Sequence, residues 1–599
     1  MVRRRLRGMW PLVILAGLLS GTAPRTARGD AKDQEGAAAL ARQARGVLKQ
    51  FCFRCHHGES SEGGDFDMLK QPDLLSKDVR DPPLVVAGKP AESYLFERIA
   101  KNQMPPKNIK ERPADADKEL IRRWIEAGAP PFPDDATRRS FITLVSVLSA
   151  ARDHMRNADA TDRPFLRFFT LHTLANNPSV TDDDLRSARA ALSKAINSLS
   201  RKPRIVVPQA IDQTRTLFAV DLRDFDWDRG SLWFTVERAY PYGLKYDGLA
   251  DETLRRLDRD LSDLAGCDLP VIRADWFVAT ATRPPLYHSL LHIPENASLL
   301  EQELSVDIAA NFLQPRPDRI ARAGFARSGV SGQNRMVERH DAQFGAYWKS
   351  YDFKPTNGRS NLARFPLGPL NLFPEGRHPF PNQSFSHDGG EIIFNLPNGL
   401  QGYLLVNGKN GRIDVGPIAV VGDALKTAGT PEIVAGLSCM ACHKHGTIAF
   451  QDEIRKNSAV FGEAEEQVRR LYPEKPVMDR LLQQDSDRFL AALEKAVGPF
   501  LREGADKQKA IREFPEPIGE LARFYRLNYL DLKAIASELD LEDPQVIVRQ
   551  VGETKLKRLG LDGLLRGGVV GRQEWEATSG LSLMQELARE LRLTPIMIR

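Results

Sequence analysis

The chain has 599 residues, a formal net charge of +5 and 42% hydrophobic residues. A chain of this length folds into several domains, and this hydrophobic content is sufficient for ordinary packed cores. The small net charge, with no basic block interleaved with aromatic residues, argues against a nucleic-acid-binding protein. Five cysteines are present, and four of them fall into one pattern that occurs twice. The fifth, Cys267, is expected to be a buried thiol.

Residues 1–29 have the pattern of a secretory signal peptide. Residues 3–7 are rich in arginine, residues 9–21 form a short apolar run, and small residues surround a possible cleavage point near 27–29. So short an apolar run fits a signal peptide better than a transmembrane helix. We therefore expect export, to the periplasm or beyond, and a mature chain without a membrane span. Retention of the segment as an uncleaved anchor is the alternative.

The recurring pattern is C-x-x-C-H, at residues 52–56 and 439–443. Two thiols at this spacing can form thioether bonds to the two vinyl groups of one haem, and the adjacent histidine then lies beneath the iron as an axial ligand. A thioredoxin-like pair would need a βαβ context, and a zinc site would need four ligands close together. The sequence therefore predicts two covalently bound haem c groups. The predicted attachment and proximal residues are Cys52, Cys55, His56, Cys439, Cys442 and His443.

Residues 30–135 have the element order of a small, all-α, class I-like cytochrome c domain. The first predicted helix leads directly into Cys52. Met104 lies between the last two helices and is followed by two prolines, which stiffen the loop so that the thioether can be held toward the iron. The expected elements are a helix over 37–49, loops over 56–83, and helices over 90–100 and 117–127.

This segment resembles the planctomycete-type cytochrome c domain. The matching stretches are residues 51–56, 63–66, 87–90, 93–95, 104–106 and 124–129. The resemblance implies His56 as the proximal ligand and Met104 as the distal ligand of the first iron. Met68 is the rival for the distal role, and we interpret it as a core residue because methionine usually fills gaps in packed interiors. We expect His57 to face solvent.

The remainder is predicted to be a multidomain α+β region. Residues 136–200 are expected to form a segment of three helices, the last capped by Ser179 or Thr181. Residues 201–480 are expected to form a central α+β domain with a β-meander, Asn-Gly turns and the second motif, and residues 481–599 a helical C-terminal region. The predicted strands are 204–207, 217–222, 232–236, 391–396, 402–406 and 411–421, and the predicted helices include 251–264, 463–472 and 478–496.

This large region resembles the longer secreted di-haem proteins that carry a planctomycete-type cytochrome domain at one end. The stretches that carry the resemblance are residues 347–353, 387–394, 396–403 and 438–443. That resemblance extends the haem interpretation over most of the chain, but it implies no particular substrate or reaction.

The distal ligand of the second iron is less well defined by the sequence than its proximal ligand. Met478 is placed slightly ahead of the others, because two nearby prolines stiffen its approach as they do at Met104. His387 is the next candidate, because the glycines that follow it form a turn beside the strands that precede Cys439. The candidates are Met478, His387, His445, Met336 and His340, or an open position.

Two functions of different classes follow from this pattern. The first is electron transfer with a redox partner protein, since histidine and methionine ligation raises the reduction potential of haem iron. The alternative is a haem oxidoreductase, of peroxidase-like or small-ligand-reducing type, with an open second haem. Its basis is the mass of protein around the second motif, which exceeds what a simple carrier needs. A third possibility is a binding domain in which the second haem is structural.

Overall fold

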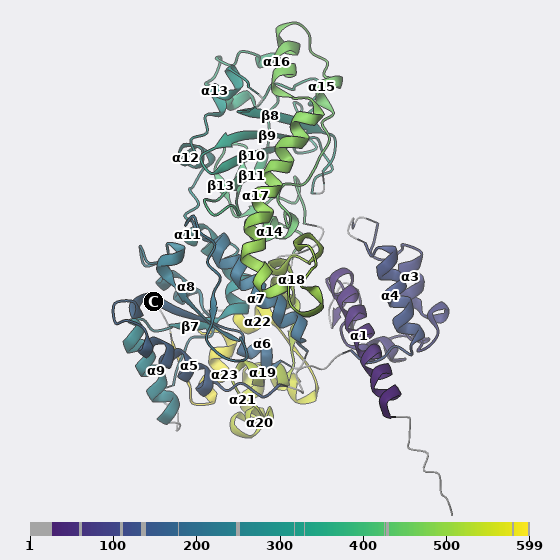
Figure 1. The fold of residues 1–599 in the computed structure, drawn as a ribbon, viewed down its shortest axis with the longest axis vertical. Helices are drawn as coiled ribbons and strands as arrows, with labels where there is room; N and C mark the ends of the chain where they lie inside the picture. The colour runs from purple at the N-terminus through teal and green to yellow at the C-terminus, as the bar shows by residue number, and fades with distance from the viewer. Residues whose placement is uncertain are drawn as a thin grey trace, which may run out of the picture.

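The structure is a computed structural model that describes residues 27–58, 63–107, 109, 112–132, 139–177, 179–246, 252–316, 318–328, 330–423, 426, 430–577 and 580–596. Its elements gather into three bodies (Figure 1): a small helical domain, an upper body around a large sheet, and a lower body of helices around a smaller sheet. The expected signal segment lies outside the described residues except for its last three. The mixed, multidomain α+β architecture predicted above is confirmed.

The small domain is helical apart from a two-stranded ladder formed by β1 (His57–Gly58) and β2 (Phe66–Asp67). Its core contains Trp124 and Ile121, both fully buried. The predicted helices are confirmed, the first being longer than expected at its N-terminal end. The helices are α1 (Ala27–Phe51), α2 (Gln71–Leu75), α3 (Tyr94–Ala100), preceded by a 3-10 turn at Pro90–Glu92, and α4 (Asp115–Glu126).

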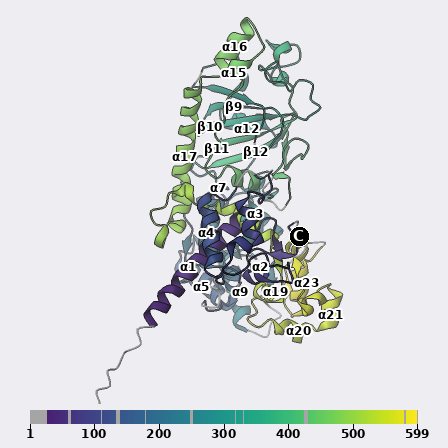
Figure 2. The same ribbon diagram turned by 90° about the vertical axis from the view of Figure 1, so that its right-hand side faces the viewer.

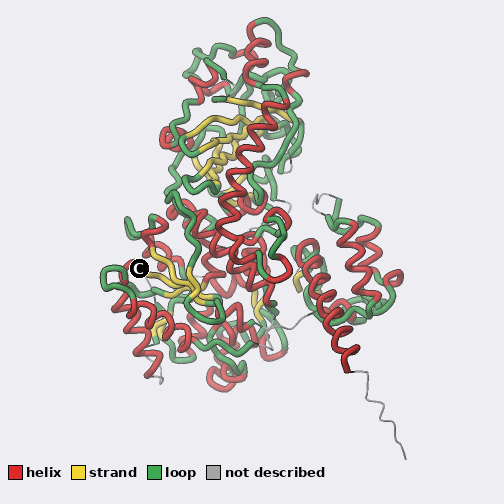
Figure 3. The backbone as a smooth tube through the Cα atoms, viewed as in Figure 1, coloured by secondary structure: helices red, strands yellow, loops and turns green. Residues whose placement is uncertain are grey.

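The upper body contains an antiparallel sheet (Figure 3), which has six strands in the order β13-β12-β11-β10-β9-β8. The strands are β8 (Ile320–Phe325), β9 (Arg335–Ala342), β10 (Gly345–Asp352), β11 (Gly389–Asn395), β12 (Gln401–Asn407) and β13 (Arg412–Ile413). The two predicted strands over 391–396 and 402–406 are confirmed. β8 to β10 were not predicted, because their charged residues conceal the apolar alternation. Those charges are buried as pairs: Arg322 with Glu338 at 2.8 Å, and Arg339 with Asp485 at 2.8 Å.

The lower body contains a four-stranded sheet in the order β4-β5-β3-β7. Its strands are β3 (Leu166–Thr170), β4 (Gln209–Ala210), β5 (Leu217–Asp221) and β7 (Val271–Arg273), with β3 and β7 parallel. The expectation of three helices over 136–200 is therefore partly wrong. This segment forms α5 (Leu144–Asn157), then β3, the short α6 (His172–Asn176) and α7 (Asp182–Ser198). Thr181, rather than Ser179, caps α7 in a capping box with Asp184.

Three further strand predictions need correction. Residues 204–207 form no strand, and residues 232–236 lie in a helix, α8 (Leu232–Ala239). The β-rich composition of that segment is overridden because Leu232, Trp233 and Val236 fall on one buried helical face. Residues 411–421 form only the short β13 and β14 (Val415–Gly416), which pairs with β15 (Ile433–Val434). The predicted helix over 251–264 is confirmed as α9 (Glu252–Ala265).

The C-terminal helices pack onto both large bodies. α16 (Glu463–Leu471) and α17 (Lys475–Leu501) confirm two predictions, and α17 runs along the upper sheet and continues onto α7 (Figure 2). Helix α18 (Pro517–Leu527) packs against α10 (Ala274–Ala281) of the lower body. The remaining C-terminal helices are α19 (Leu532–Glu538), α20 (Gln545–Val551), α21 (Glu553–Arg558), α22 (Arg572–Glu576) and α23 (Leu583–Glu590). At the end of the chain, β18 (Thr594–Pro595) pairs with β6 (Leu244–Lys245). None of the helices among the described residues is both long and apolar enough to cross a membrane.

A buried charge network joins the C-terminal helices to the lower body. The Glu538 carboxylate accepts hydrogen bonds from Arg273 at 3.1 Å, from Arg572 at 2.7 Å and from the indole of Trp575 at 2.8 Å. Burial acts to raise the pKa of Glu538, but the two guanidinium groups outweigh it and lower the pKa to about 2. The carboxylate is therefore ionised and stabilises the contact between sequence-distant segments.

We predict that Glu538→Ala destabilises the lower body by about 3–5 kcal/mol, because buried Arg572 loses its counter-charge and buried Arg273 keeps only Asp275. Urea unfolding followed by circular dichroism measures this, with the exposed Glu542→Ala as a control expected to change the stability by less than about 0.5 kcal/mol. Since the folded pKa is depressed, this stabilisation is present above the unfolded pKa of about 4.3 and is lost as pH falls toward the folded value. Equal stabilities of the two variants would contradict the prediction.

Candidate cofactor sites

The first motif forms a tight turn at the end of α1. The helix ends at Phe51, and the amides of Cys55 and His56 both donate to the carbonyl of Cys52 at 3.1 Å. Cys52 is buried, and Cys55 is half-buried. The turn therefore presents two thiols and a histidine within a few residues, as covalent haem attachment requires.

The histidine of this motif lies in a cradle that only glycine can complete. The ring of His56 stacks on Phe66 with a centroid distance of 4.9 Å. A Cβ atom at Gly63 would lie 2.1 Å from His56 Nδ1, so a side chain there would displace the imidazole. Burial lowers the pKa of His56, which favours the neutral imidazole, the form that ligates iron. These observations fit an axial ligand.

The two methionines of the small domain have different surroundings. Met68 is 3% exposed and belongs to the core of the domain, in agreement with its interpretation as a packing residue. Met104 is half-buried, and its amide donates to the carbonyl of Arg98 at the end of α3. His57, in contrast, does not simply face solvent, because its ring stacks on Tyr529 of the lower body at 6.1 Å.

The second motif lies on the short helix α14 (Leu437–Cys442). Gly436 precedes this helix with φ of +80°, and a Cβ atom there would lie 2.4 Å from the carbonyl oxygen of Thr282. Glycine therefore allows α14 to approach the lower body closely. Cys439 is buried, and Cys442 and His443 are half-buried.

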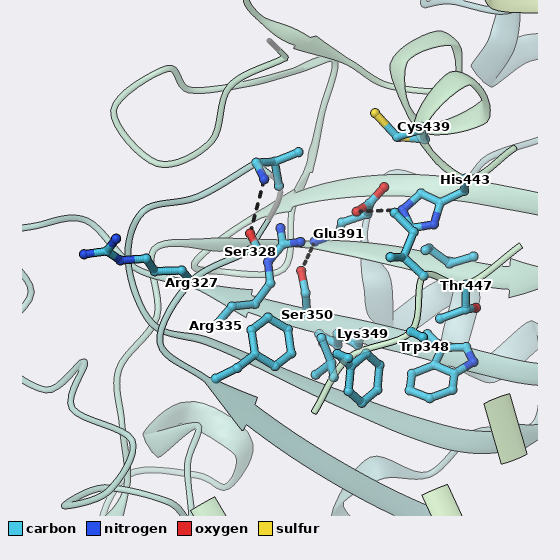
Figure 4. A pocket seen from close by; sticks show the side chains of 18 of the residues that line it. Arg327, Ser328, Arg335, Trp348, Lys349, Ser350, Glu391, Cys439, His443 and Thr447 are labelled. Atoms are coloured by element: carbon cyan, nitrogen blue, oxygen red, sulfur yellow. Dashed lines mark hydrogen bonds and ion pairs between the residues drawn. The ribbon is translucent and has the colours of Figure 1, made fainter. Parts of the chain in front are cut away.

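A cavity of about 510 Å³ opens beside this motif (Figure 4). Its floor is one face of the large sheet, because alternating residues of a strand point to the same side. α14 and residues 447–451 form the opposite wall. The residues on the sheet face are Arg335, Val337, Trp348, Ser350, Glu391 and Ile393.

The imidazole of His443 is oriented toward this cavity. Its Nδ1 lies 3.2 Å from the carbonyl oxygen of Gly446, and its Nε2 lies 3.7 Å from an oxygen of Glu391 (Figure 4). Histidines that bind metal commonly donate their other ring N–H to a backbone carbonyl, which fixes the tautomer and leaves the second nitrogen free. Burial acts to raise the pKa of Glu391, but the nearby His443 and Arg335 side chains outweigh it and lower the pKa to about 2.

These features fit a haem. The cavity volume is within the range of cofactor pockets, which are typically about 300–1,000 Å³ and mostly apolar with a few polar groups. Val337, Trp348 and Ile393 supply apolar walls, and Arg335 is a buried cation. Arg327 lies at the exposed side of the cavity, where a haem carboxylate could meet it.

The five predicted candidates for the distal position do not line this cavity. Met478 is buried in α17, and Met336 belongs to a different core cluster. His340 is fully buried beside Asn311, which lies 3.1 Å away. His387 packs edge-on against Tyr351, and burial lowers its pKa to about 4. The fifth candidate, His445, is likewise absent from the lining of the cavity.

Glu391 is the cavity residue that the sequence reasoning missed. Its signal was present in the sequence: it is a carboxylate at an inward-facing position of the predicted strand 391–396. Among the described residues that line the cavity, His443 is the only histidine and there is no methionine. Nor do the described residues contain a cluster of three or more His, Cys, Asp or Glu side chains arranged to hold a metal ion.

Comparison with known proteins identifies the small domain. The family model of planctomycete cytochrome C matches residues 52–108. This part of the chain is therefore a planctomycete-type cytochrome c domain, as predicted, which implies covalently bound haem c and haem-based electron transfer. No curated protein and no solved structure matches the chain.

We predict that each pair of motif cysteines carries half of the covalently bound haem. The double variants Cys52→Ser/Cys55→Ser and Cys439→Ser/Cys442→Ser should each lose half of the haem that remains with the denatured chain, because serine forms no thioether. Pyridine-haemochrome absorbance per chain measures this. Cys267→Ser is the control and should retain all of it, whereas full retention in the second double variant would show that the second motif binds no haem.

Proposed function

We propose that this protein is an exported di-haem c-type cytochrome that transfers electrons through two covalently bound haems. The observation that supports the second haem most directly is the cavity beside Cys439, Cys442 and His443, which has a suitable volume and an apolar lining. Export is part of the proposal and rests on the pattern of residues 1–29 and on the fact that c-type haem is attached outside the cytoplasm.

The chain's own residues have definite tasks in this function. When bound, haem supplies a one-electron iron couple, and the protein supplies attachment, orientation and electrostatics. Gly446 holds the His443 ring in place, and the carbonyl–histidine contact increases the basicity of the ligand nitrogen. Trp348, Val337 and Ile393 keep water away from the site, which influences the reduction potential.

A second candidate function is favoured by the sheet face of the cavity. It presents Glu391, Arg335 and Ser350 rather than a histidine or methionine from among the described residues. A haem clamped between α14 and this face would have a polar side on which a small ligand such as cyanide or a peroxide could bind. The second site would then belong to an oxidoreductase that receives electrons through the first.

Ligand titration separates the two functions. The native protein is titrated with cyanide in the ferric state and with carbon monoxide in the ferrous state, while the absorbance of both haems is followed. Two haems that remain low-spin and bind neither ligand support simple electron transfer. One haem that binds ligand supports the oxidoreductase, and a single haem per chain would refute the di-haem proposal.

We predict that Met104 ligates the first iron. Met104→Leu should lower the reduction potential of that haem, because thioether ligation favours the reduced state. It should also make the haem reactive toward carbon monoxide, because leucine offers no ligand atom for the iron. Met68→Leu is a matched control, since both substitutions conserve volume, and it should leave the spectrum unchanged. Spectroelectrochemical titration compares the variants. An unchanged potential in Met104→Leu would assign the ligand to another side chain.

A further inference from the structure

The first of the two residues between the cysteines of the first motif is buried outside its own domain. Phe53 is 4% exposed and belongs to the core cluster of the large bodies, whereas Cys52, its neighbour, belongs to the core of the small domain. The Phe53 ring stacks on Phe524 of α18 with a centroid distance of 6.2 Å. The cysteine-bearing side of the cytochrome domain therefore faces the lower body.

Charged groups hold the domain in this orientation. Arg45 and Lys49, one turn apart on α1, contact the two carboxylate oxygens of Asp184 at 3.0 and 2.5 Å. Arg45 also donates to the carbonyl of Ser179 at 3.0 Å. Burial acts to raise the pKa of Asp184, but the two cations outweigh it and hold the pKa well below its usual range. These three charged groups are largely buried, so they restrict the orientation of the domain more strongly than an exposed ion pair would.

A second aromatic contact lies on the other side of the motif. His57, which follows the proximal histidine, stacks on Tyr529 with an interplanar angle of 17°. Tyr529 lies just beyond the end of α18. Phe53 and His57 thus anchor the motif turn at two points along the same segment of the lower body.

The same helix reaches the second motif. α18 packs against α14, which carries Cys439 and Cys442, as well as against α7 and α10. An α-helix with its side chains is about 10–12 Å across. The two motifs are distant in sequence, but only one helix separates the chain segments that carry them.

We propose that the redox partner of the first haem is the second haem of the same chain, and that the Phe53–Phe524 contact and α18 form the route between them. This inference rests on the proposed di-haem function. In each transfer, one iron is oxidised as it gives up an electron and the other is reduced as it accepts it, with no change in covalent bonds. External redox proteins must then use a surface other than the buried cysteine-bearing side.

Charge reversal on α1 tests this route. The double variant Arg45→Glu/Lys49→Glu faces Asp184 with like charges, which disfavours docking, and it leaves the cysteines and the histidine of the motif unchanged. Lys101→Glu is the matched control, because this lysine is exposed and pairs only with Glu97 among the contacts that the structure gives. Haem content, each haem's spectrum and each potential are measured first, so that the comparison is made between fully loaded proteins.

Two readouts follow in the full-length protein. Hydrogen exchange should be faster around Phe524 and Tyr529 in the double variant than in Lys101→Glu, because the docked domain no longer contacts these two residues. After flash reduction, the phase of electron exchange between the haems should be independent of protein concentration in the native protein and roughly 10-fold slower or more in the double variant. Phe53→Leu should slow this phase of electron exchange without changing the hydrogen exchange of Arg45 and its neighbours.

The outcomes are distinct. Slower exchange of electrons together with faster hydrogen exchange supports the route. An unchanged rate in an undocked variant overturns it, as does a native rate that increases in proportion to protein concentration. A haem count of one per chain would refute the di-haem function itself, whereas two haems with an unslowed rate would overturn only the route.

Discussion

The packing of α18 is the constraint on which the arrangement of both sites depends. Its apolar face, which includes Ile518 and Ala522, is fully buried against helices from the lower body and against α14. Phe524 of the same helix receives Phe53 from the cytochrome domain. Because protein interiors are close-packed, a shift of this helix would be transmitted to both motifs. A single apolar contact surface thus relates segments that lie far apart in the sequence.

The two motifs have the same sequence pattern but different structural settings. The first lies in a turn after a long helix, within a small domain whose helices and haem-binding residues are close together in the chain. The second lies on a six-residue helix whose cavity is completed by β9, β10 and β11 of the large sheet. A site assembled from several remote strands can present charged groups such as Glu391 and Arg335 to a bound ligand.

Buried charge explains much of where the sequence reasoning succeeded and failed. Helices with a clear apolar face, such as residues 252–265, and the strands around Ile392 and Leu404 were predicted because their patterns matched one period. β9 was missed because Glu338, Arg339 and His340 are buried in it, each beside a partner supplied by another segment. The segment 232–236 was wrongly predicted as a strand, since local β propensity was overridden by tertiary packing.

The sequence by itself determined the two C-x-x-C-H motifs, the planctomycete-type cytochrome c domain and the mixed α+β architecture, because these depend on short spacings and local periodicity. Only the tertiary structure revealed that Glu391 lies 3.7 Å from His443 Nε2, and that Phe53 leaves its own domain to pack on α18. Both features depend on long-range contacts between strands and helices whose pairing no local pattern encodes. Motifs made of neighbouring residues could therefore be predicted from the sequence, whereas contacts made by tertiary packing could not.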